Sequence, residues 1–247
     1  AVAVAAGEVP GRLAALREQH RWSLDALLAA VRRSAGTQTL VLMDSPRHAS
    51  NVGSVMRQAS VLQAPGSEDS VSAVLVASSR GSAGGQPAGP TEKFLKSVLR
   101  ISLAARHRTL QMPTRLVALP PGNPAGALQA LRGEGFTCVA LENREACLAG
   151  SATPPALPLW DAPLGACSRL LLLAGSEEHS LSESLLSLCD LQCYVPGAAC
   201  PLAAGAALRR ELGQEGQNPT LNLAHAVVVA LYERRRQLAR GAAAATG

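Results

Sequence analysis

Apolar runs of strand length alternate along the chain with stretches in which apolar residues recur at helical spacing. This alternation is typical of an α/β fold, and it predicts a parallel sheet with helices on both faces. The strands are predicted near residues 39–43, 72–77, 115–119, 136–141, 169–174 and 192–195. The helices between them are predicted near residues 51–63, 91–103, 124–133, 182–188 and 219–238.

The two ends of the chain stand outside this alternation. Between Gly11 and Arg33 the apolar residues have helical periodicity, with Ser23 as a candidate cap inside the segment. We therefore expect a short helical N-terminal extension over residues 1–36, an α/β domain over 37–240 and a disordered tail over 241–247. The arginines of the extension could contact RNA, but a solvated helix face is the favoured interpretation.

Polar loops follow two of the predicted strands. After the first strand Asp44 begins a polar turn, and a helix starts near Asn51, with Arg57 in its second turn. The strand at 169–174 breaks at Gly175, and Glu177 lies in the loop that follows. Because open α/β sheets bind ligands at the carboxyl ends of their strands, both loops are candidates for a site.

Near the C-terminus a polar turn joins directly to an apolar helix. Either Asn218 or Thr220 would cap this helix, and Pro219 suits its first turn. Taken alone the segment is an ordinary helix start. It also holds hydroxyl and amide groups, including those of Thr220 and Asn222, in an exposed loop that is pinned to a buried element.

These three segments, taken in order, resemble the three motifs of the SpoU-type (TrmH-like) RNA 2′-O-methyltransferases of the SPOUT superfamily. The Asn-x-Gly-x-x-x-Arg core of the first motif is matched by Asn51, Gly53 and Arg57, and the second motif by Gly175, Glu177 and Leu181. The third motif is matched by Val195, Pro196, Thr220, Leu221 and Asn222. The resemblance covers roughly residues 37–240, with the identity concentrated in the motifs, and the wording of the third motif is closest to the branch that modifies tRNA.

The resemblance implies a fold, a cofactor and roles for residues. It implies a deep trefoil knot in the C-terminal third of the chain, a homodimer and a pocket for S-adenosylmethionine. Arg57 would engage the RNA phosphate or the attacking hydroxyl, and Asn51 would orient that region. Glu177 would fix the arginine and its loop, while Thr220 and Asn222 would hold the ribose. The residues that would cradle the cofactor are Ala174, Gly175, Val195, Pro196 and Leu221.

The second motif departs from the family pattern. Glu178 and Ser180 stand where the family has glycines, so side chains occupy places where backbone usually approaches the cofactor. Two functions follow. The first is an S-adenosylmethionine-dependent ribose 2′-O-methyltransferase acting on tRNA or rRNA. The alternative is a catalytically inactive protein of the same fold that binds RNA or a ribosomal assembly intermediate.

Composition narrows the classes of partner. The net charge is +5 and is carried almost entirely by arginine, since Lys93 and Lys96 are the only lysines. Arginine suits bidentate phosphate contacts, so RNA is a plausible partner. With two each of Phe, Trp and Tyr, a surface built on stacking of exposed bases is not expected. A dinucleotide-dependent oxidoreductase is excluded because no Gly-x-Gly-x-x-Gly follows the first strand.

Cysteine spacing and hydropathy bear on metals and compartment. None of the six cysteines has Cys-x-x-Cys spacing, so we expect no metal and a reducing compartment, with Cys138 and Cys189 as small apolar residues. The longest apolar runs fall far short of the ~20 residues that span a bilayer, so no membrane partner is expected. We expect a soluble protein of the mitochondrion or cytoplasm, from which a targeting peptide has been removed.

Overall fold

The computed structural model describes residues 19–62, 72–78, 89–103, 114–142, 156–176, 180–196 and 221–246. These residues form one sheet of eight strands in the order β1-β4-β3-β2-β7-β5-β8-β6, and every pair of neighbours is parallel. The strands are β1 (Arg21–Trp22), β2 (Gln38–Asp44), β3 (Ser72–Ala77), β4 (Arg115–Ala118), β5 (Thr137–Leu141), β6 (Ala156–Pro158), β7 (Arg169–Ala174) and β8 (Leu191–Tyr194). The helices are α2 (Leu24–Arg33), α3 (Ala49–Leu62), α4 (Glu92–Leu103), α5 (Pro124–Gly133), α7 (Glu183–Leu186) and α9 (Leu223–Thr246).

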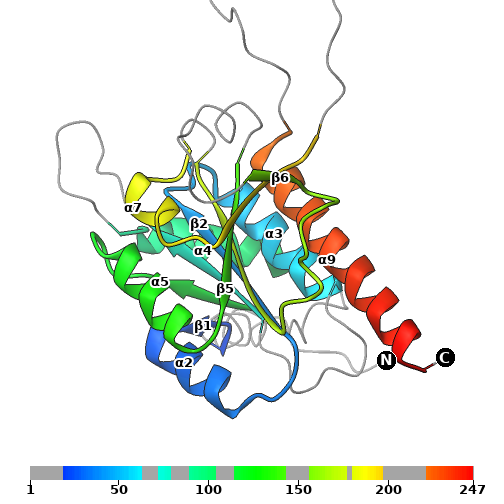
Figure 1. Cartoon of the computed structure of the whole chain (residues 1–247). Helices are drawn as coiled ribbons and strands as arrows, with labels where there is room; N and C mark the ends of the chain where they lie inside the picture. Colours follow the sequence, from blue (N-terminus) through cyan, green and yellow to red (C-terminus); the bar gives the residue numbers. More distant parts are fainter. Residues whose placement is uncertain are drawn as a thin grey trace, which may run out of the picture.

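Helices cover both faces of the sheet, as the sequence predicts (Figure 1). Helices α3, α4 and α9 pack over one face around a core that includes Val41, Val55 and Val227. Helices α2, α5 and α7 pack over the other face around Leu42 and Leu128. Strands β2, β3 and β7 lie between the two cores and are buried along almost their whole length, which is why they read as continuous apolar runs.

The segment before the predicted domain is joined to this same core. Ser23 caps α2 by accepting a hydrogen bond from the backbone N–H of Ala26 at 3.1 Å, as predicted. Leu27 and Val31 of α2 are fully buried under the sheet. Strand β1 pairs with β4 at the sheet edge. The sequence does not predict this strand, because two residues are too few to show the alternation of apolar and polar side chains that marks a strand.

Helix α9 differs at both ends from its predicted bounds. It begins at Leu223 rather than near residue 219, and it continues to Thr246 rather than ending near residue 238. The predicted disordered tail is therefore corrected for residues 241–246, which are helical. Ala242 to Ala245 form an unbroken alanine run, and alanine has the highest helix propensity of all residues.

A buried arginine fastens α9 to the body of the sheet. Arg234 is 2% exposed. Its guanidinium donates to the hydroxyl of Thr39 at 2.8 Å and to the carbonyls of Gln38 and Cys167 at 3.0 Å each, and also to the carbonyls of Leu164 and Ser168. Burial lowers the pKa of Arg234 to about 10, which leaves it charged at neutral pH. The Arg234 guanidinium thus connects α9 to the amino end of β2 and to the segment before β7.

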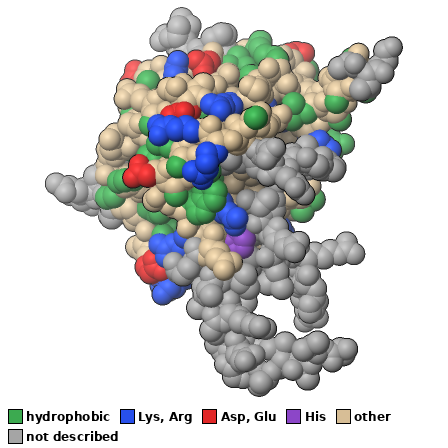
Figure 2. All heavy atoms as spheres, turned by 90° about the horizontal axis from the view of Figure 1, so that it is seen from below, with side chains coloured by type: hydrophobic (Ala, Val, Ile, Leu, Met, Phe, Trp, Pro, Cys, Tyr) green, Lys and Arg blue, Asp and Glu red, His purple; other side chains and the backbone are tan. Residues whose placement is uncertain are grey.

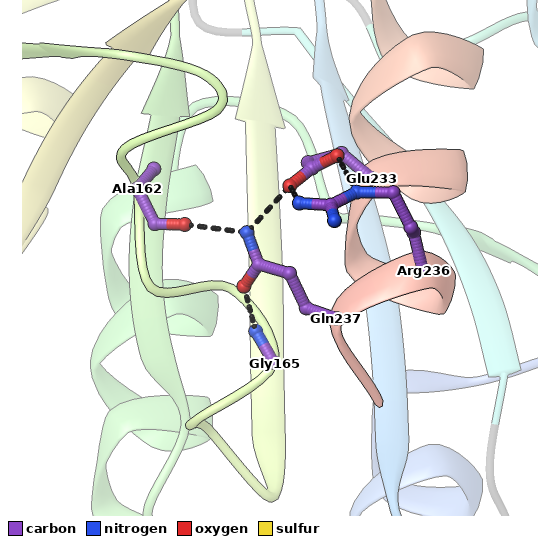
Figure 3. Close-up of polar contacts among 5 residues, drawn as sticks. All are labelled: Ala162, Gly165, Glu233, Arg236 and Gln237. Carbon is purple, nitrogen blue, oxygen red and sulfur yellow. Dashed lines mark hydrogen bonds and ion pairs between the residues drawn. The ribbon is translucent and has the colours of Figure 1, made fainter. Parts of the chain in front are cut away.

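One helical turn further along α9, Gln237 binds the segment that precedes β7 (Figure 3). Its amide nitrogen donates to the carbonyl of Ala162 at 2.9 Å, and its amide oxygen accepts the N–H of Gly165 at 2.7 Å. Glu233, which is paired with Arg236, accepts a further hydrogen bond from the Gln237 amide at 2.8 Å. A Cβ added to Gly165 would lie 2.5 Å from the Cβ of Gln237, so only glycine lets the two backbones come this close.

The C-terminal third of the chain, where the trefoil knot is expected, includes residues 197–220, which lie outside the described residues, so the knot stays a prediction. The described helices include none that is both long and apolar enough to cross a membrane.

Candidate active site at the carboxyl edge of the sheet

The predicted site falls where the strand order reverses. Strands β2 and β7 are neighbours, but β2 is followed by α3 on one face and β7 by α7 on the other. A crevice outside the carboxyl ends of such a pair is the usual ligand site of an open α/β sheet. The register places Met43, Ala174, Leu141 and Cys193 at one level across β2, β7, β5 and β8.

The turn after β2 is locally strained. Ser45 has φ of 53°, in the left-handed region that non-glycine residues seldom adopt. Its N–H donates to the carbonyl of Ala77 at 2.9 Å, and its hydroxyl donates to the buried carboxylate of Asp44 at 3.1 Å. These bonds hold the chain in a sharp turn between the end of β2 and the start of α3.

The first predicted motif lies on α3, but its members face different neighbours. Asn51 is buried in the first turn of the helix, near the carboxyl edge. Gly53 faces α4, where an added Cβ would lie 2.9 Å from the Cβ of Ile101 and 3.0 Å from the carbonyl oxygen of Val98. The glycine therefore permits a close crossing of α3 and α4.

Arg57 also faces α4. Its guanidinium donates to the carbonyl of Ile101, one of the last carbonyls of α4, which have no partner within their own helix. The Nε atom of Arg57 is buried and has no hydrogen-bond partner among the described residues. Arg57 follows Asn51 by six residues, which is about 9 Å along a helix axis. In this conformation the arginine thus caps α4.

The second predicted motif begins at the end of β7. Ala174 and Gly175 are buried, and Ser176 is half-buried. Glu177, Glu178 and His179 lie outside the described residues. Ser180 is exposed and Leu181 is buried in the core under α7.

A residue that the sequence does not single out lies beside this loop. Glu142 directly follows β5, and its carboxylate accepts the N–H of Leu181 at 2.7 Å. Burial raises the pKa of Glu142, against the lowering effect of its hydrogen bonds with Leu181 and Ser180. A lone glutamate with no motif around it carries no sequence signal, so only the strand order reveals its place.

The third predicted motif is split between β8 and α9. Val195 and Pro196 follow β8 and are half-buried, and Leu221 is 49% exposed at the start of α9. Asn222 caps α9, since its side-chain oxygen accepts the N–H of Ala224 at 2.9 Å. The cap is thus Asn222 and not Asn218 or Thr220, both of which lie outside the described residues.

Core packing brings the three segments to one region. Ala224 of α9 lies in the same buried cluster as Ala174 and Val52, and Val195 packs against that cluster. The structure therefore joins the start of α3, the end of β7, the end of β8 and the start of α9. It does not join Arg57 to Asn222, because the arginine is turned towards α4.

Two of the described cysteines, Cys138 and Cys189, are buried in the core. Burial raises the pKa of Cys138 to about 12 and also raises the pKa of Cys189. Both thiols therefore stay protonated at neutral pH and pack as small apolar side chains. Among the described residues no group of three His, Cys, Asp or Glu side chains is placed to hold a metal ion.

Comparison with solved structures identifies the fold. The chain is similar to the SpoU methyltransferase AviRb from Streptomyces viridochromogenes, with 22% identity over 84% of this chain and 63% of that one and a TM-score of 0.52. It is also similar to an rRNA methyltransferase from Sinorhizobium meliloti, with 17% identity over 85% of this chain and 60% of that one and a TM-score of 0.53. Both of these were solved with S-adenosylmethionine bound.

A third similar structure is closer to this chain in length. The A. aeolicus TrmH/SpoU tRNA modifying enzyme has 15% identity over 92% of this chain and 86% of that one, with a TM-score of 0.51. The chain thus spans less than two thirds of the length of the first two structures and most of the third. No protein-family model matches this sequence, and no curated protein sequence matches it.

Proposed function

We propose that this chain, which has the fold of the SpoU-type RNA methyltransferases, is a divergent member of that family and a ribose 2′-O-methyltransferase of tRNA or rRNA. One observation carries the proposal. Three segments that resemble the family motifs, far apart in the sequence, meet at the carboxyl edge of the sheet where its strand order reverses. In open α/β sheets this reversal point is the usual position of a ligand site, which supports a functional role for the three segments.

The residues at this edge suit S-adenosylmethionine. The ligand has an apolar adenine ring, and the exposed side chain of Leu221 and the half-buried side chain of Val195 offer apolar contact. Gly175 is buried and has no side chain, so backbone can approach a ligand closely there. Ala174, Pro196 and Leu221 would complete the cradle. When bound, the cofactor supplies a methyl group on a positively charged sulfur.

The residues of this chain would position the second reactant. In-line transfer needs the ribose hydroxyl aligned with the methyl group, and such positioning can supply much of the barrier reduction. Asn222 uses its amide oxygen to cap α9, which leaves its amide nitrogen as a donor for ribose oxygens, and Thr220 would add a hydroxyl. Arg57 would hold the RNA phosphate or the attacking hydroxyl, with Asn51 orienting it and Glu177 fixing the arginine.

The surface offers places for RNA phosphates. Seen from the side on which α2 lies, basic side chains cluster in the middle of the described surface, with acidic ones among them (Figure 2). Arg32 and Arg33 at the end of α2 are exposed, although Arg32 is paired with Glu134 at 2.7 Å. Helix α4 carries a second basic face, formed by Lys93, Lys96 and Arg100. These three side chains line a shallow groove together with Glu92 and Ser97.

Calorimetric titration with S-adenosylmethionine and S-adenosylhomocysteine tests the cofactor, and transfer of labelled methyl groups to tRNA and rRNA tests the reaction. We expect binding, and thermal stabilisation of about 2.7 kcal/mol with ligand at a hundred times its dissociation constant. Methylated product should resist alkaline cleavage at one position, since the 2′-hydroxyl is blocked. Labelled product that remains fully cleavable would contradict the ribose assignment.

Arg57→Ala tests the assigned arginine. We expect methyl transfer to fall by about a hundredfold or more while the protein still unfolds cooperatively, since the transition state loses a positioned charge. Arg57→Lys separates this role from the cap on α4, because lysine can still donate to one carbonyl but lacks the planar fork. Arg240→Ala, at an exposed arginine of α9, is the matched control. Wild-type transfer by Arg57→Ala would overturn the assignment.

Two observations favour a second function, an RNA-binding or ribosome-assembly protein without catalysis. Arg57 is occupied with the Ile101 carbonyl, and Ser180 replaces a glycine of the second motif. Failure of the folded protein to bind either ligand at millimolar concentration, together with retained binding of RNA, would establish this alternative.

A further inference from the structure

Glu142 lies between the two strand ends that are predicted to hold the cofactor. Leu141, the last residue of β5, pairs with Ala174 of β7 on one side and with Cys193 of β8 on the other. The next position along is therefore flanked by Gly175 and Tyr194. The N–H of Glu142 donates to the carbonyl of Cys193 at 3.0 Å, which fixes its backbone to β8.

The side chain of Glu142 reaches across to the chain that follows β7. Its carboxylate accepts the N–H of Leu181 at 2.7 Å and a hydrogen bond from the side chain of Ser180. Leu181 is anchored by burial of its own side chain under α7. One carboxylate thus links the end of β5 to the point where the chain from Gly175 turns towards α7.

The hydrogen bond from Ser180 gives a structural role to a residue that departs from the second motif of the family. A glycine at this position has no side chain and could not donate to Glu142. The serine departs from the family pattern, but it adds a contact to an acid on the neighbouring strand. The two residues therefore act as a pair, in which the carboxylate makes use of the hydroxyl that replaces the glycine.

Burial of the Glu142 carboxylate has an energetic cost, which its hydrogen bonds offset in part. Glu142 is half-buried, and the described residues supply two donors to its carboxylate, the N–H of Leu181 and the hydroxyl of Ser180. A neutral glutamine of the same shape could accept the N–H of Leu181 with less desolvation. The two donors thus hold the carboxylate beside the end of β7 although burial disfavours its charge, and a strained ionisable group at a strand end is typical of a functional site.

We propose that Glu142 is a positioning residue, whose carboxylate holds Ser180 and Leu181 against the end of β5 and so sets the edge of the ligand site beside Gly175. The part that concerns the ligand rests on the proposed function. The tether itself does not, because its hydrogen bonds are properties of the protein alone.

Hydrogen exchange of the Leu181 amide tests the tether without any ligand. In Glu142→Ala we expect exchange at Leu181 to quicken at least tenfold while exchange in β5 and β7 stays slow, since the acceptor of this N–H is gone. Glu142→Gln should keep most of the protection, because its amide oxygen can accept the same bond. Unchanged exchange in Glu142→Ala would overturn the tether.

Titration with S-adenosylhomocysteine tests the positioning role. We expect Glu142→Ala to weaken binding by about tenfold, the scale of one charge-assisted hydrogen bond, and Glu142→Gln to stay within about threefold of the wild type. Ser180→Ala, which keeps the Leu181 contact, should lie between the two. Unchanged affinity in Glu142→Ala with a loosened Leu181 amide would overturn the positioning role.

Asp190, which directly precedes β8, is a matched control because its carboxylate bonds to the opposite end of β5. Its carboxylate accepts the N–H of Cys138 at 2.8 Å near the amino end of β5, and it is paired with Arg132 at 3.1 Å. Asp190→Ala removes the same kind of bond from the same strand, and we expect it to leave ligand affinity unchanged. Equal weakening by Asp190→Ala and Glu142→Ala would show a general loss of stability and overturn the proposal.

The two proposals fail in different ways. If the wild-type protein binds neither ligand, the proposed function and the ligand part of this inference are overturned together, while the exchange measurement still decides the tether. If Glu142→Ala does not fold, Ser180→Ala, which removes one of the two hydrogen bonds, is compared with the wild type and Glu142→Gln, and unchanged affinity in Ser180→Ala overturns the positioning role.

Discussion

Single polar side chains connect segments that are far apart in this sequence. Arg234 joins α9 to Thr39, a separation of 195 residues, and Glu142 joins β5 to Leu181, a separation of 39. Both side chains are ionisable and at least partly buried. In the protein interior hydrogen bonds are stronger than in water, and a polar group without a partner is costly. Their removal should therefore have effects that can be measured on the whole protein.

Replacing Arg234 with methionine should destabilise the protein by about 3 kcal/mol or more, because buried carbonyls of two separate segments lose their donor. Arg234→Lys should recover little, since a single ammonium cannot reach acceptors on several sides. Urea unfolding measures both variants. Arg240→Met, at an exposed arginine of the same helix, should stay within about 0.5 kcal/mol of the wild type. Equal stability of the two methionine variants would show that the buried network contributes nothing.

Glu142 should make stability depend on pH. Burial raises its pKa in the folded protein above the ordinary value of 4.5, so the folded state binds more protons than the unfolded state between the two values. The contribution of this group is therefore fully present below the ordinary pKa and is lost as pH rises through the raised one. Relative to the wild type, Glu142→Gln should gain stability as pH rises across this window. Urea unfolding of both proteins from pH 4 to 8 measures the difference, and parallel curves would contradict the assignment.

At the scale of elements, α3 and α4 cross at close range. Gly53 and Arg57, both part of the first predicted motif, face Ile101 of α4. The same spacing that marks a candidate site thus also serves helix packing. A motif glycine can be required by a neighbouring helix as well as by a ligand.

Gly53→Ala should destabilise the protein by about 1–3 kcal/mol, because the added methyl group meets the Ile101 side chain and the Val98 carbonyl. Gly241→Ala is the matched control, since Gly241 also lies within a helix but has nothing within 4 Å of its added Cβ. This control should gain about 0.5–1 kcal/mol from helix propensity. Thermal unfolding measures the stability of both variants. Higher stability in both would show that the crossing of α3 and α4 accommodates a methyl group and would contradict this prediction.

At the scale of the whole molecule, the exposed apolar side chains bear on the expected homodimer. On α9, Val227 and Leu231 are buried within the chain's own core and are not available for an interface. The outer face of α9 instead carries Val229, 39% exposed, and Tyr232, 60% exposed. One turn apart on one helix face, these two are better candidates for an interface than the buried pair.

We expect light scattering to give twice the chain mass of 25.4 kDa. Tyr232→Glu should halve that value by placing a charge in the apolar contact. Val61→Glu, at a 70% exposed valine at the end of α3, should leave the mass unchanged. A wild-type mass of 25.4 kDa would contradict the homodimer.

The amino-acid sequence by itself determined most strands and helices and the order of the motif loops. Their apolar periods are local properties, and strands buried on both faces leave an unmistakable run of Val and Leu. The sequence also placed Asn51 at the start of its helix and Gly175 and Val195 just after their strands, because cap and turn residues act within a few positions of themselves.

Only the tertiary structure decided which polar groups meet. Strand β1 exists because β4 offers it an edge, and the partners of Arg57, Glu142 and Arg234 come from segments 44, 39 and 195 residues away. Nothing in the local sequence distinguishes these side chains from the other arginines and glutamates on helices and at strand ends. Their roles follow from burial, because an unpaired buried donor or acceptor is costly and most such groups therefore pair with whichever group the fold brings close.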